Sequence, residues 1–387
     1  MAGNIACLRG WHPALAKAEL SALFPENKIK PLESRRLVEI CGDLNLLEAT
    51  EVIQYSSGVQ AILSDSIIMN WDGENSMEKF LHQVSIMIED SQRTGSFSVS
   101  HWRQEGKIKG LSGSKIAGMI GGLAGRNGFT IDLDNPEHKL GLVIDGASNM
   151  VACGWLIDYI STEGNSNTRR ATERPFFKPI SLDPKLARLA VNLAGGPLDD
   201  NAVLDPMTGT GGFVIEAAMI GRKAIALDLE QEMVDGAMKN VLWALSSEEV
   251  TDKSRIQIIK GDATDLRNSI PSNWHQQISG MVLDPPYGRN SHGSLTHFEL
   301  IENTLHSFRD VANDDATIVL ILPIHPLQEK RLELDEDSED IKLLHGEWTK
   351  FKQMLKNGKW TIKGIWVEHV HSSLGRLILH ASSVPQD

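Results

Sequence analysis

Cysteine is scarce in this chain, and the three that occur lie far apart. Cys7, Cys41 and Cys153 stand among 387 residues, an odd number with no Cys-x-x-Cys spacing. A disulfide framework needs an even number of cysteines, and a cysteine zinc site needs short repeated spacings. No cluster of histidine and cysteine replaces them. We therefore expect no bound metal, no disulfide framework and a reducing, cytoplasmic setting.

Long apolar runs are also missing. A membrane-spanning helix needs about 20 consecutive apolar residues, and no stretch of this sequence approaches that length. Residues 1–7 lack the basic, apolar and small-residue order of a signal peptide. The composition, 41% apolar and 23% charged, is typical of globular proteins, and 387 residues predict two or three domains. We expect a soluble protein without membrane association.

An overall excess of positive charge is missing too. The formal net charge is −13, whereas a nucleic-acid binder is expected to be basic somewhere. Residues 91–128 are the exception, with six basic residues against Glu105. The glycine- and serine-rich stretch 110–115 precedes a predicted helix, where loop amides and a lysine can hold a phosphate. A solvated basic face is an equally good interpretation. The candidate nucleic-acid contacts are Arg103, Lys107, Lys109, Lys115 and Arg126.

The most informative segment, 281–288, reads Met-Val-Leu-Asp-Pro-Pro-Tyr-Gly. Pro285 and Pro286 fix the backbone and remove two N–H donors, which leaves carbonyls in a rigid corner after a strand. Asp284 and the Pro285 carbonyl can accept the two N–H groups of an exocyclic amine, while Tyr287 stacks on the base. Such a site would methylate the amine by positioning it, with Asp284 accepting the released proton. A strand followed by a proline-rich turn without chemistry is the alternative.

Residues 202–228 show the pattern of a nucleotide-binding unit, namely strand, glycine-rich turn, helix and strand. Gly209, Gly211 and Gly212 let a ligand approach the backbone closely where the helix begins. Asp228 ends the second strand, 19 residues after Gly209. A carboxylate at that place can hold two ribose hydroxyls.

Asp205, at the end of the first strand, decides between two ligand classes. A dinucleotide would put its pyrophosphate at the following helix N-terminus, where an acidic neighbour would repel it. A carboxylate there suits the α-ammonium group of S-adenosylmethionine instead. Charge complementarity therefore favours S-adenosylmethionine, and Pro206 and Thr208 of the same turn join its candidate binding residues.

A third strand is predicted over 255–259, with Gly-Asp-Ala following at 261–263. Asp262, with Ala263 beside it, can accept from the amino group of adenine, although a simple turn aspartate explains it as well. Acids thus follow four predicted strands. Because ligands of open α/β sheets bind outside the carboxyl ends of strands, we expect these acids to converge on one crevice.

These motifs resemble the class I, Rossmann-like S-adenosylmethionine-dependent methyltransferases, and within them the enzymes that methylate exocyclic nitrogens. The resemblance implies an α/β methyltransferase domain over 176–387 with S-adenosylmethionine as cofactor. It implies that Asp205 and its glycines hold the methionine part, Asp228 the ribose and Asp262 the adenine. A predicted strand over 316–322 and a closing hairpin from 364–370 and 374–381 agree with that fold.

The N-terminal half resembles the THUMP domain of RNA-modifying enzymes. The resemblance rests on 96–100, the helix after Lys115, 130–136 and 140–145. It implies a THUMP RNA-binding domain over 73–160, preceded by a small ferredoxin-like α+β domain over 1–72 and followed by a linker over 161–175. In that family the two domains hold the acceptor end of tRNA.

Together the two halves resemble the archaeal-type tRNA guanosine N2-methyltransferases. The resemblance implies methylation of the guanosine at position 10, once or twice, after the base is extruded from its stem. It implies tRNA as partner, with no obligatory protein partner. Phe176 and Phe177 could line the target pocket, but core packing is favoured.

Three alternatives keep the chemistry and change the substrate: another tRNA guanosine, a ribosomal RNA guanosine, or adenine N6 in DNA. A fourth makes the chain a non-catalytic RNA-binding protein, against which the intact Asp205, Asp228, Asp262 and Asp284 argue.

Overall fold

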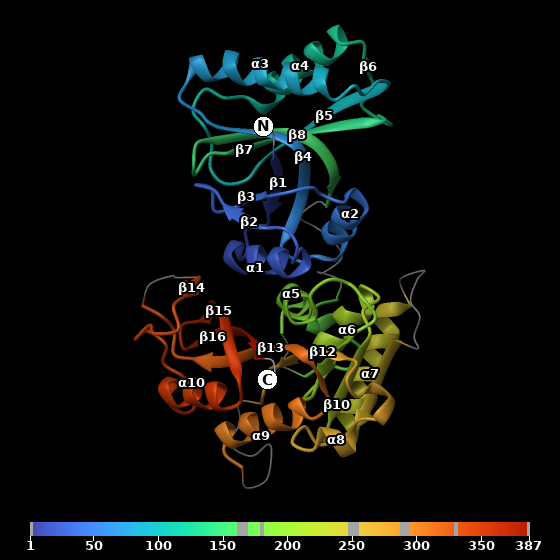
Figure 1. Cartoon of the computed structure of the whole chain (residues 1–387), viewed down its shortest axis with the longest axis vertical. Helices are drawn as coiled ribbons and strands as arrows, with labels where there is room; N and C mark the ends of the chain where they lie inside the picture. Colours follow the sequence, from blue (N-terminus) through green and yellow to red (C-terminus); the bar gives the residue numbers. More distant parts are fainter. Residues whose placement is uncertain are drawn as a thin grey trace. The chain divides into compact units, whose positions relative to one another are not determined.

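A computed structural model describes residues 3–160, 169–178, 182–246, 255–286, 295–328 and 332–384. The chain forms two compact units, Met1–Gly164 and Asn165–Asp387. Each unit is an α/β structure built on one eight-stranded mixed sheet (Figure 1). The predicted linker, 161–175, lies partly outside the described residues, since 161–168 are not among them.

The first unit consists of strands interspersed with four helices among its described residues. Its first half consists of β1 (Gly3–Leu8), α1 (Pro13–Leu23), β2 (Ile29–Pro31), β3 (Leu37–Ile40), α2 (Leu46–Tyr55) and β4 (Val59–Asn70). Its second half consists of α3 (Glu74–Asp90), β5 (Ser96–Arg103), α4 (Gly113–Arg126), β6 (Thr130–Ile131), β7 (His138–Asp145) and β8 (Met150–Tyr159). The sheet order is β2-β3-β1-β4-β8-β7-β5-β6. The antiparallel pair of β4 and β8 therefore joins the two halves in one sheet.

Three apolar clusters hold this unit together. Helices α1 and α2 pack on β1, β3 and β4, while α3 and α4 pack on β5, β7 and β8. A third cluster joins strands of both halves, with Leu63 of β4 and Val143 of β7 among its members. Helix α4 shows how the sequence sets this arrangement, because its buried Ile116, Ile120 and Ala124 recur every four residues along one face.

The second unit has more helix on both faces of its sheet. Its first part consists of α5 (Pro184–Gly195), β9 (Ala202–Asp205), α6 (Gly212–Met219), β10 (Ala224–Asp228), α7 (Gln231–Leu245), β11 (Ile256–Lys260), α8 (Leu266–Ser269) and β12 (Ile278–Leu283). Its second part consists of α9 (His297–Arg309), β13 (Ala312–Ile324), β14 (Glu333–Leu334), α10 (Trp348–Asn357), β15 (Trp360–His371) and β16 (Leu374–Ser383). Helices α5, α6 and α7 cover one face and α8, α9 and α10 the other (Figure 1).

The order of the strands creates a switch point beside β9. The sheet runs β11-β10-β9-β12-β13-β16-β15-β14, with β11 to β13 parallel. The chain builds outward from β9 to β11 and then crosses to β12 on the other side of β9. Ligands of open α/β sheets bind at such a reversal of strand order. The predicted strands are confirmed, and so is the closing hairpin, since β15 and β16 pair antiparallel.

Helix α5 is fixed firmly against the sheet. Asp183 caps its N-terminus by accepting from the amide of Lys185, and Pro184 begins the helix. At its other end the guanidinium of the buried Arg222 donates to the carbonyls of Gly195 and Gly196. These contacts satisfy carbonyls that a helix end leaves without partners.

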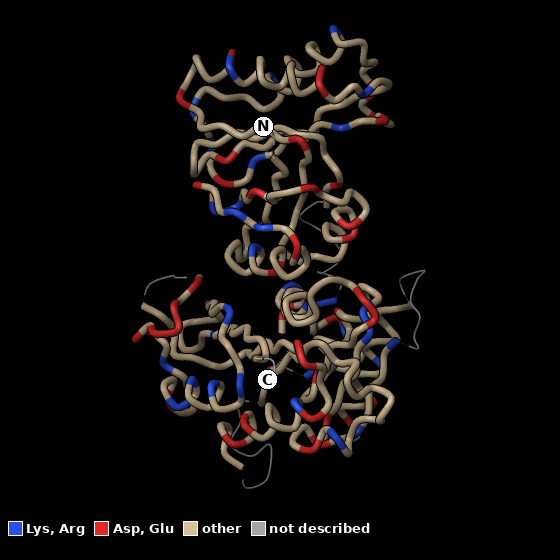
Figure 2. Tube along the Cα trace, in the orientation of Figure 1, with Lys and Arg blue, Asp and Glu red and all other residues tan. Residues whose placement is uncertain are grey.

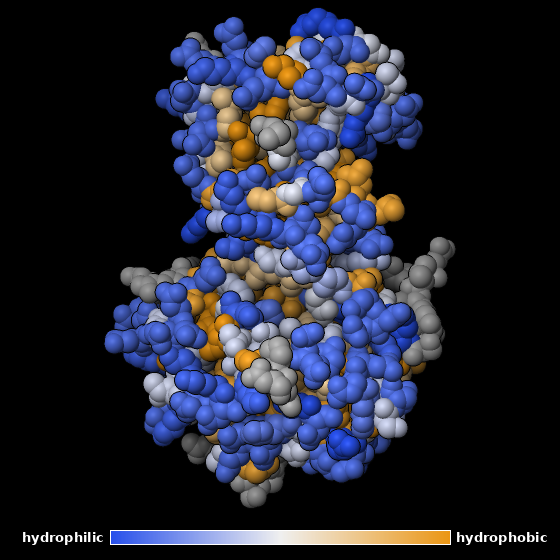
Figure 3. Space-filling model, viewed as in Figure 1, coloured by the Kyte–Doolittle hydropathy of each residue, from blue (hydrophilic) through white to orange (hydrophobic). Residues whose placement is uncertain are grey.

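The face of the molecule seen in Figure 3 is mostly polar, and charges of both signs are spread over both units (Figure 2). The first turn of α2 is an exception, where Leu46 and Leu47 are 53% and 79% exposed. Among the described residues, no helix is long and apolar enough to cross a membrane.

Gly280 of β12 should tolerate no side chain. A Cβ there would overlap the carbonyl oxygen of Ala194 in α5, and Thr317 of β13 donates to the same oxygen at 2.5 Å. We expect Gly280→Ala to destabilise the second unit by about 1–3 kcal/mol, as overpacked sites do. The loss of stability is measured by urea denaturation, monitored through the hydrogen exchange of peptides from β9 and β12.

Gly118→Ala is the matched control, because a Cβ at Gly118 of α4 meets nothing within 4 Å. It should stabilise its own unit by roughly 0.5–1 kcal/mol and leave the second unit unchanged. Equal unfolding midpoints for Gly280→Ala and the wild type would contradict the close approach of α5.

Candidate functional site

Three acids meet at the carboxyl edge of the second sheet, around the switch point. Asp205 and Asp228 are the last residues of β9 and β10, and Asp284 directly follows β12. Strand β12 pairs with β9 so that Met281 lies opposite Leu204. Asp228 and Asp284 lie near enough to Asp205 to raise its pKa. Of the four acids predicted to converge, Asp205, Asp228 and Asp284 therefore do so, whereas a place for Asp262 in the same site stays a prediction.

Asp228 organises the turn that follows β9. Its Oδ2 accepts from the amide of Gly209 at 2.9 Å, and its Oδ1 accepts from the amide of Glu230 at 3.0 Å. The carboxylate at the end of β10 is therefore held in place by two backbone donors. Its side chain fixes the glycine turn beside it, in addition to any contact with a ligand.

Asp205 is the most unusual ionisable group of the site. The pKa of its carboxyl is raised to about 7, chiefly by burial and in part by the charges of Asp228 and Asp284, although the nearby Thr208 hydroxyl and Met207 amide oppose the rise. Asp205 Oδ2 and Thr208 Oγ1 are buried with no hydrogen-bond partner among the described residues. A buried acceptor of this kind needs a donor, preferably a cationic one.

The glycine turn between β9 and α6 leaves room beside the backbone. Gly209 and Gly211 have φ values of +52° and +85°, which residues with a side chain rarely adopt. A Cβ at Gly209 would meet nothing within 4 Å, whereas one at Gly211 would press on Ala237 of α7 at 3.1 Å. Gly211 is thus needed for packing, and Gly209 for the turn and the open space. Pro206 is buried at the start of the turn.

Asp262 lies just after β11 and shapes its own turn. Its Oδ1 accepts from both the amide and the hydroxyl of Thr264, at 2.8 and 2.7 Å. The amide of Asp262 donates to Ser269. The turn interpretation therefore applies to Oδ1, while the side chain is exposed and Ala263 beside it is buried.

Asp284 stands where β12 ends, half-buried, followed by the buried Pro285 and the half-buried Pro286. No residue beyond Pro286 is described until residue 295, so Tyr287 lies outside the described residues. The predicted stacking role of Tyr287 stays a prediction.

A buried cluster of charged side chains around Glu216 of α6 was not predicted from the sequence. Glu216 of α6 is fully buried and accepts from Arg169 and Arg188, at distances from 2.7 to 3.2 Å. The signal was present, because a single carboxylate in the otherwise apolar helix Gly212–Met219 requires a buried cationic partner.

Asn240 of α7 is a second residue that the sequence analysis missed. Its side chain bonds both the amide and the carbonyl of Phe176 and also donates to the carbonyl of Thr210. A Cβ at Gly236 would collide with the Phe176 ring, so that ring packs flat on α7. The packing role favoured for both aromatics holds for Phe176, whereas Phe177 is 47% exposed.

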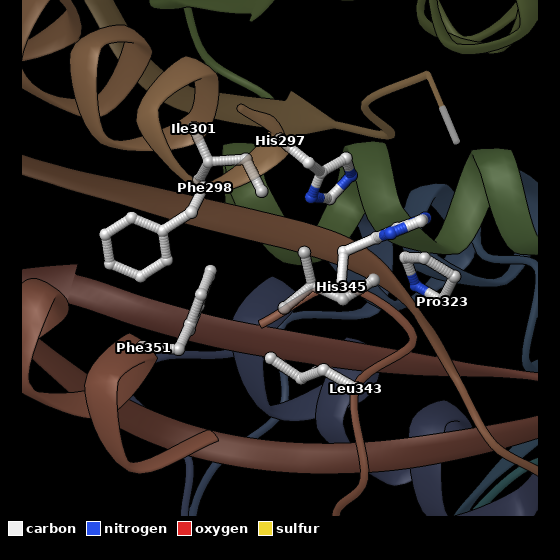
Figure 4. A pocket seen from close by; sticks show the side chains of 8 residues that line it. His297, Phe298, Ile301, Pro323, Leu343, His345 and Phe351 are labelled. Carbon is white, nitrogen blue, oxygen red and sulfur yellow. The ribbon is translucent and has the colours of Figure 1, made fainter. Parts of the chain in front are cut away.

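A small pocket lies at the same edge of the sheet, between α9 and the end of β13 (Figure 4). The imidazoles of His297 and His345 face each other across it, with ring centroids 4.9 Å apart. Burial, and secondarily His345, lowers the pKa of His297 to about 4, so this ring is neutral. The space inside would admit a water molecule but no base. Its other lining residues are Phe298, Ile301, Leu322, Pro323, Leu343 and Phe351.

The five candidate basic residues of the first unit are all exposed: Arg103, Lys107, Lys109, Lys115 and Arg126. Four of them lie at or near the N-terminus of α4, which Ser112 caps by accepting from the amide of Lys115. Arg126 lies in the last turn of the same helix. At 1.5 Å per residue, Arg126 lies about 16 Å from Lys115 along the helix axis. Arg93, also basic, stacks over Trp155.

Comparison with known proteins gives the family of the chain. A family model described as the RMKL-like methyltransferase domain matches residues 171–353. A relative from Methanothermococcus thermolithotrophicus, named probable tRNA (guanine(10)-N2)-dimethyltransferase, is 34% identical over 135 residues, which cover 35% of this chain and 77% of that relative. This chain belongs to the RMKL-like family of class I S-adenosylmethionine methyltransferases.

A second relative of this methyltransferase is the tRNA (guanine(10)-N2)-dimethyltransferase of Pyrococcus abyssi, 31% identical over 198 residues. The match spans 50% of this chain and 54% of that relative, so about half of its length. Among solved structures, TrmN from Thermus thermophilus aligns over 98% of this chain and 99% of its own, with 18% identity and a TM-score of 0.44.

The residues at the switch point fit the cofactor of this family. Asp205 Oδ2 and Thr208 Oγ1, which have no hydrogen-bond partner within the described ranges, are acceptors suited to a cationic amino group. The open space at Gly209 lies beside the Asp228 carboxylate, which could accept from ribose hydroxyls. Strands β9 and β10 thus end in carboxylates that suit the cationic and hydroxyl groups of this cofactor.

The raised pKa of Asp205 predicts a pH-dependent affinity for the cofactor product, S-adenosylhomocysteine. Only the ionised carboxylate attracts its α-ammonium, so affinity should rise up to roughly tenfold per pH unit between pH 5.5 and 7 and level off above about 7. Titration calorimetry across this range checks it. Asp205→Asn should bind weakly at every pH, and a parallel rise in that variant would contradict the assignment.

The same shift has a consequence for stability without ligand. The folded carboxyl keeps its proton up to about pH 7, whereas the unfolded one releases it near 3.8. Stability from this group is therefore present below pH 3.8 and is lost as the pH rises through about 7. Wild type should lose stability relative to Asp205→Asn over that interval.

Proposed function

We propose that this methyltransferase transfers methyl groups from S-adenosylmethionine to the exocyclic N2 of a guanosine in tRNA, with position 10 as the expected site. The observation that carries the proposal is the meeting of Asp205 and Asp228, on the donor side, with the Asp284-Pro285-Pro286 segment at one switch point. The names of the two relatives support the choice of tRNA and of position 10.

On the donor side, each residue takes the part that its place suggests. Asp205 accepts from the α-ammonium group, and Asp228 accepts from the ribose hydroxyls while it holds the Gly209 amide. Asp262 accepts from the adenine amino group through the oxygen that Thr264 does not use. Bound S-adenosylmethionine supplies a methyl group activated by its sulfonium.

On the acceptor side, the chain positions a weak nucleophile. The guanine amine shares its lone pair with the ring, so it attacks only when it is held and rehybridised. Asp284 and the Pro285 carbonyl accept its two N–H groups, and Tyr287 stacks on the base. As the nitrogen–methyl bond forms and the sulfur–methyl bond breaks, Asp284 accepts the amine proton. Orientation and proton transfer together account for the rate.

The first unit is proposed to bind the RNA. Its initial order, β1-α1-β2-β3-α2-β4, is the β-α-β-β-α-β order of a ferredoxin-like fold. We propose that residues 73–160 form a THUMP domain that continues this sheet, and that 161–175 link both to the methyltransferase domain. The exposed cluster near the start of α4, Arg103, Lys107, Lys109 and Lys115, supplies phosphate contacts within an otherwise acidic chain.

The proposal is tested by incubating the protein with S-adenosylmethionine and unmodified tRNA transcripts, followed by nucleoside mass spectrometry. N2-methylguanosine or N2,N2-dimethylguanosine that disappears when the guanosine at position 10 is replaced supports chemistry and site together. Methylguanosine that survives the replacement moves the target within tRNA. Absence of methylation on every tRNA contradicts the proposal and directs the assay to ribosomal RNA and to adenine N6 in DNA.

Asp284→Ala should separate binding from chemistry. The variant should bind S-adenosylhomocysteine and tRNA like wild type yet lose methyl transfer by about 10²–10⁴-fold, the range for removal of a positioned proton acceptor. Calorimetry and single-turnover methylation measure the two properties. Asp205→Ala is the counterpart and should lose the donor instead. Equal loss of donor affinity in both variants would refute the division of roles.

The basic cluster should contribute a salt-dependent part of tRNA affinity. Joint replacement of Lys107, Lys109 and Lys115 by alanine should weaken tRNA binding and flatten the plot of log K against log salt by roughly 2–3 in slope. Filter binding at several salt concentrations measures it.

Lys28→Ala is the matched control, since Lys28 is exposed beside β2, at the opposite edge of the same sheet from β5 and β6. It should leave both affinity and slope unchanged. If the triple variant kept the wild-type slope, the cluster would not contact phosphates.

A further inference from the structure

Arg174 is a buried cation whose outer nitrogens have no hydrogen-bond partner in the part of the chain that the structure describes. Only 4% of the residue is exposed, and neither Nη1 nor Nη2 makes a hydrogen bond with the described residues. Its Nε alone is used, donating to the carbonyl of Arg169 at 3.2 Å. A guanidinium with both outer nitrogens buried and unused is costly unless an anion pairs with it.

The nearby carboxylate cannot supply that anion. Glu216 already receives Nε and Nη2 of Arg169 and Nε and Nη2 of Arg188. A carboxylate offers about four lone-pair sites, and four N–H groups fill them. Arg169, Arg174 and Arg188 thus carry three positive charges against the single negative charge of Glu216. Burial lowers the pKa of Arg174, Glu216 opposes that effect, and Arg169 adds to it.

The free end of Arg174 lies at the glycine turn. Its Nη1 is 3.8 Å from the position that a Cβ on Gly212 would occupy, and Gly212 is the first residue of α6. Asp205 ends β9 on the other side of the same turn. The turn 206–211 is therefore flanked by the buried Oδ2 of Asp205 and by the buried Nη1 and Nη2 of Arg174, none of which has a hydrogen-bond partner among the described residues.

We propose that Arg174 binds the α-carboxylate of the methionine part of S-adenosylmethionine, opposite Asp205, which binds the α-ammonium on the same carbon. The inference rests on the proposed donor and names a new part of its site. Two parallel N–H···O bonds from Nη1 and Nη2 match a carboxylate in geometry. A terminal carboxylate of a small molecule can enter a place where the side chain is 4% exposed, whereas a backbone phosphate between two riboses cannot.

The segment that carries Arg174 is held to the cofactor unit. Phe176, two residues after Arg174, is hydrogen-bonded through its backbone amide and carbonyl to the Asn240 side chain of α7, and its ring packs on Gly236. The same Asn240 bonds the carbonyl of Thr210 in the turn. Arg174 and the turn are thus fixed to one another through α7, which gives the guanidinium a defined position before a ligand arrives.

The test compares two ligands that differ only in the carboxylate, S-adenosylmethionine and decarboxylated S-adenosylmethionine, by titration calorimetry. Wild type should prefer the carboxylate form by about 10- to 100-fold, the range for a charge-assisted hydrogen-bonded pair. Arg174→Met should lower the affinity for S-adenosylmethionine by that factor and change the affinity for the decarboxylated form by less than about threefold. Arg174→Lys, which keeps the charge without the fork, should recover part of the preference.

Arg188→Met is the matched control, because it removes a guanidinium from the same cluster, one that is 13% exposed and bonds Glu216. It should lower the unfolding temperature and keep the wild-type preference between the two ligands. Arg174→Met should unfold no lower than wild type without ligand, since it removes an uncompensated charge, and should show a smaller rise in unfolding temperature with S-adenosylmethionine.

Three outcomes would overturn the inference. Equal weakening of both ligands in Arg174→Met would make the residue structural. Unchanged binding of both ligands would place the carboxylate elsewhere, and tRNA binding lost with the ligand preference intact would make Arg174 a phosphate contact. Wild type that binds neither ligand would overturn the donor assignment itself, which separates that failure from failure of the Arg174 contact.

Discussion

The pairing of β12 beside β9 is the constraint on which the rest of the candidate site depends. The chain leaves the sheet at β11 and returns on the far side of β9, so Asp284 comes next to Asp205 although 79 residues separate them. Close packing of α5 on the sheet accompanies this pairing, since the Ala194 carbonyl of α5 approaches Gly280 of β12 closely and accepts from the Thr317 hydroxyl of β13. Three acids gathered at one edge repel each other, and burial adds to that cost. A cationic group of a ligand placed between these acids would offset that cost.

Charge is arranged on both sides of the turn 206–211. Carboxylates lie at the ends of β9 and β10, and three guanidiniums surround Glu216 on the other side. An anionic cofactor terminus would be repelled by the first group and a purely cationic one by the second. A zwitterionic amino-acid end suits both. The same reasoning excludes a pyrophosphate beside Asp205, so the electrostatics of the folded site agree with the family of the chain.

Much of the second unit could be predicted because its signals are local. Strands end in acids, glycines allow the positive φ of Gly209 and Gly211, and the period of apolar residues marks each helix and strand. The first unit was predicted as two domains from resemblance. In the structure both segments belong to one sheet, joined by the pairing of β4 with β8 and by a shared apolar cluster. No local sequence pattern predicts this pairing. The pairing of two strands that lie far apart in the sequence cannot be predicted from the residues of either strand alone.

By itself the sequence determined which groups are candidates for the chemistry: the acids after four strands, the glycine turn and the two prolines that follow Asp284. Only the tertiary structure decided how those groups behave. It buried Asp205 and raised its pKa, and it packed Phe176 on α7 while leaving Phe177 exposed. It also left Nη1 and Nη2 of Arg174 beside Gly212 without a hydrogen-bond partner among the described residues. The physical reason is that residue type and spacing set local conformation, whereas burial and pairing depend on segments that lie tens of residues away along the chain.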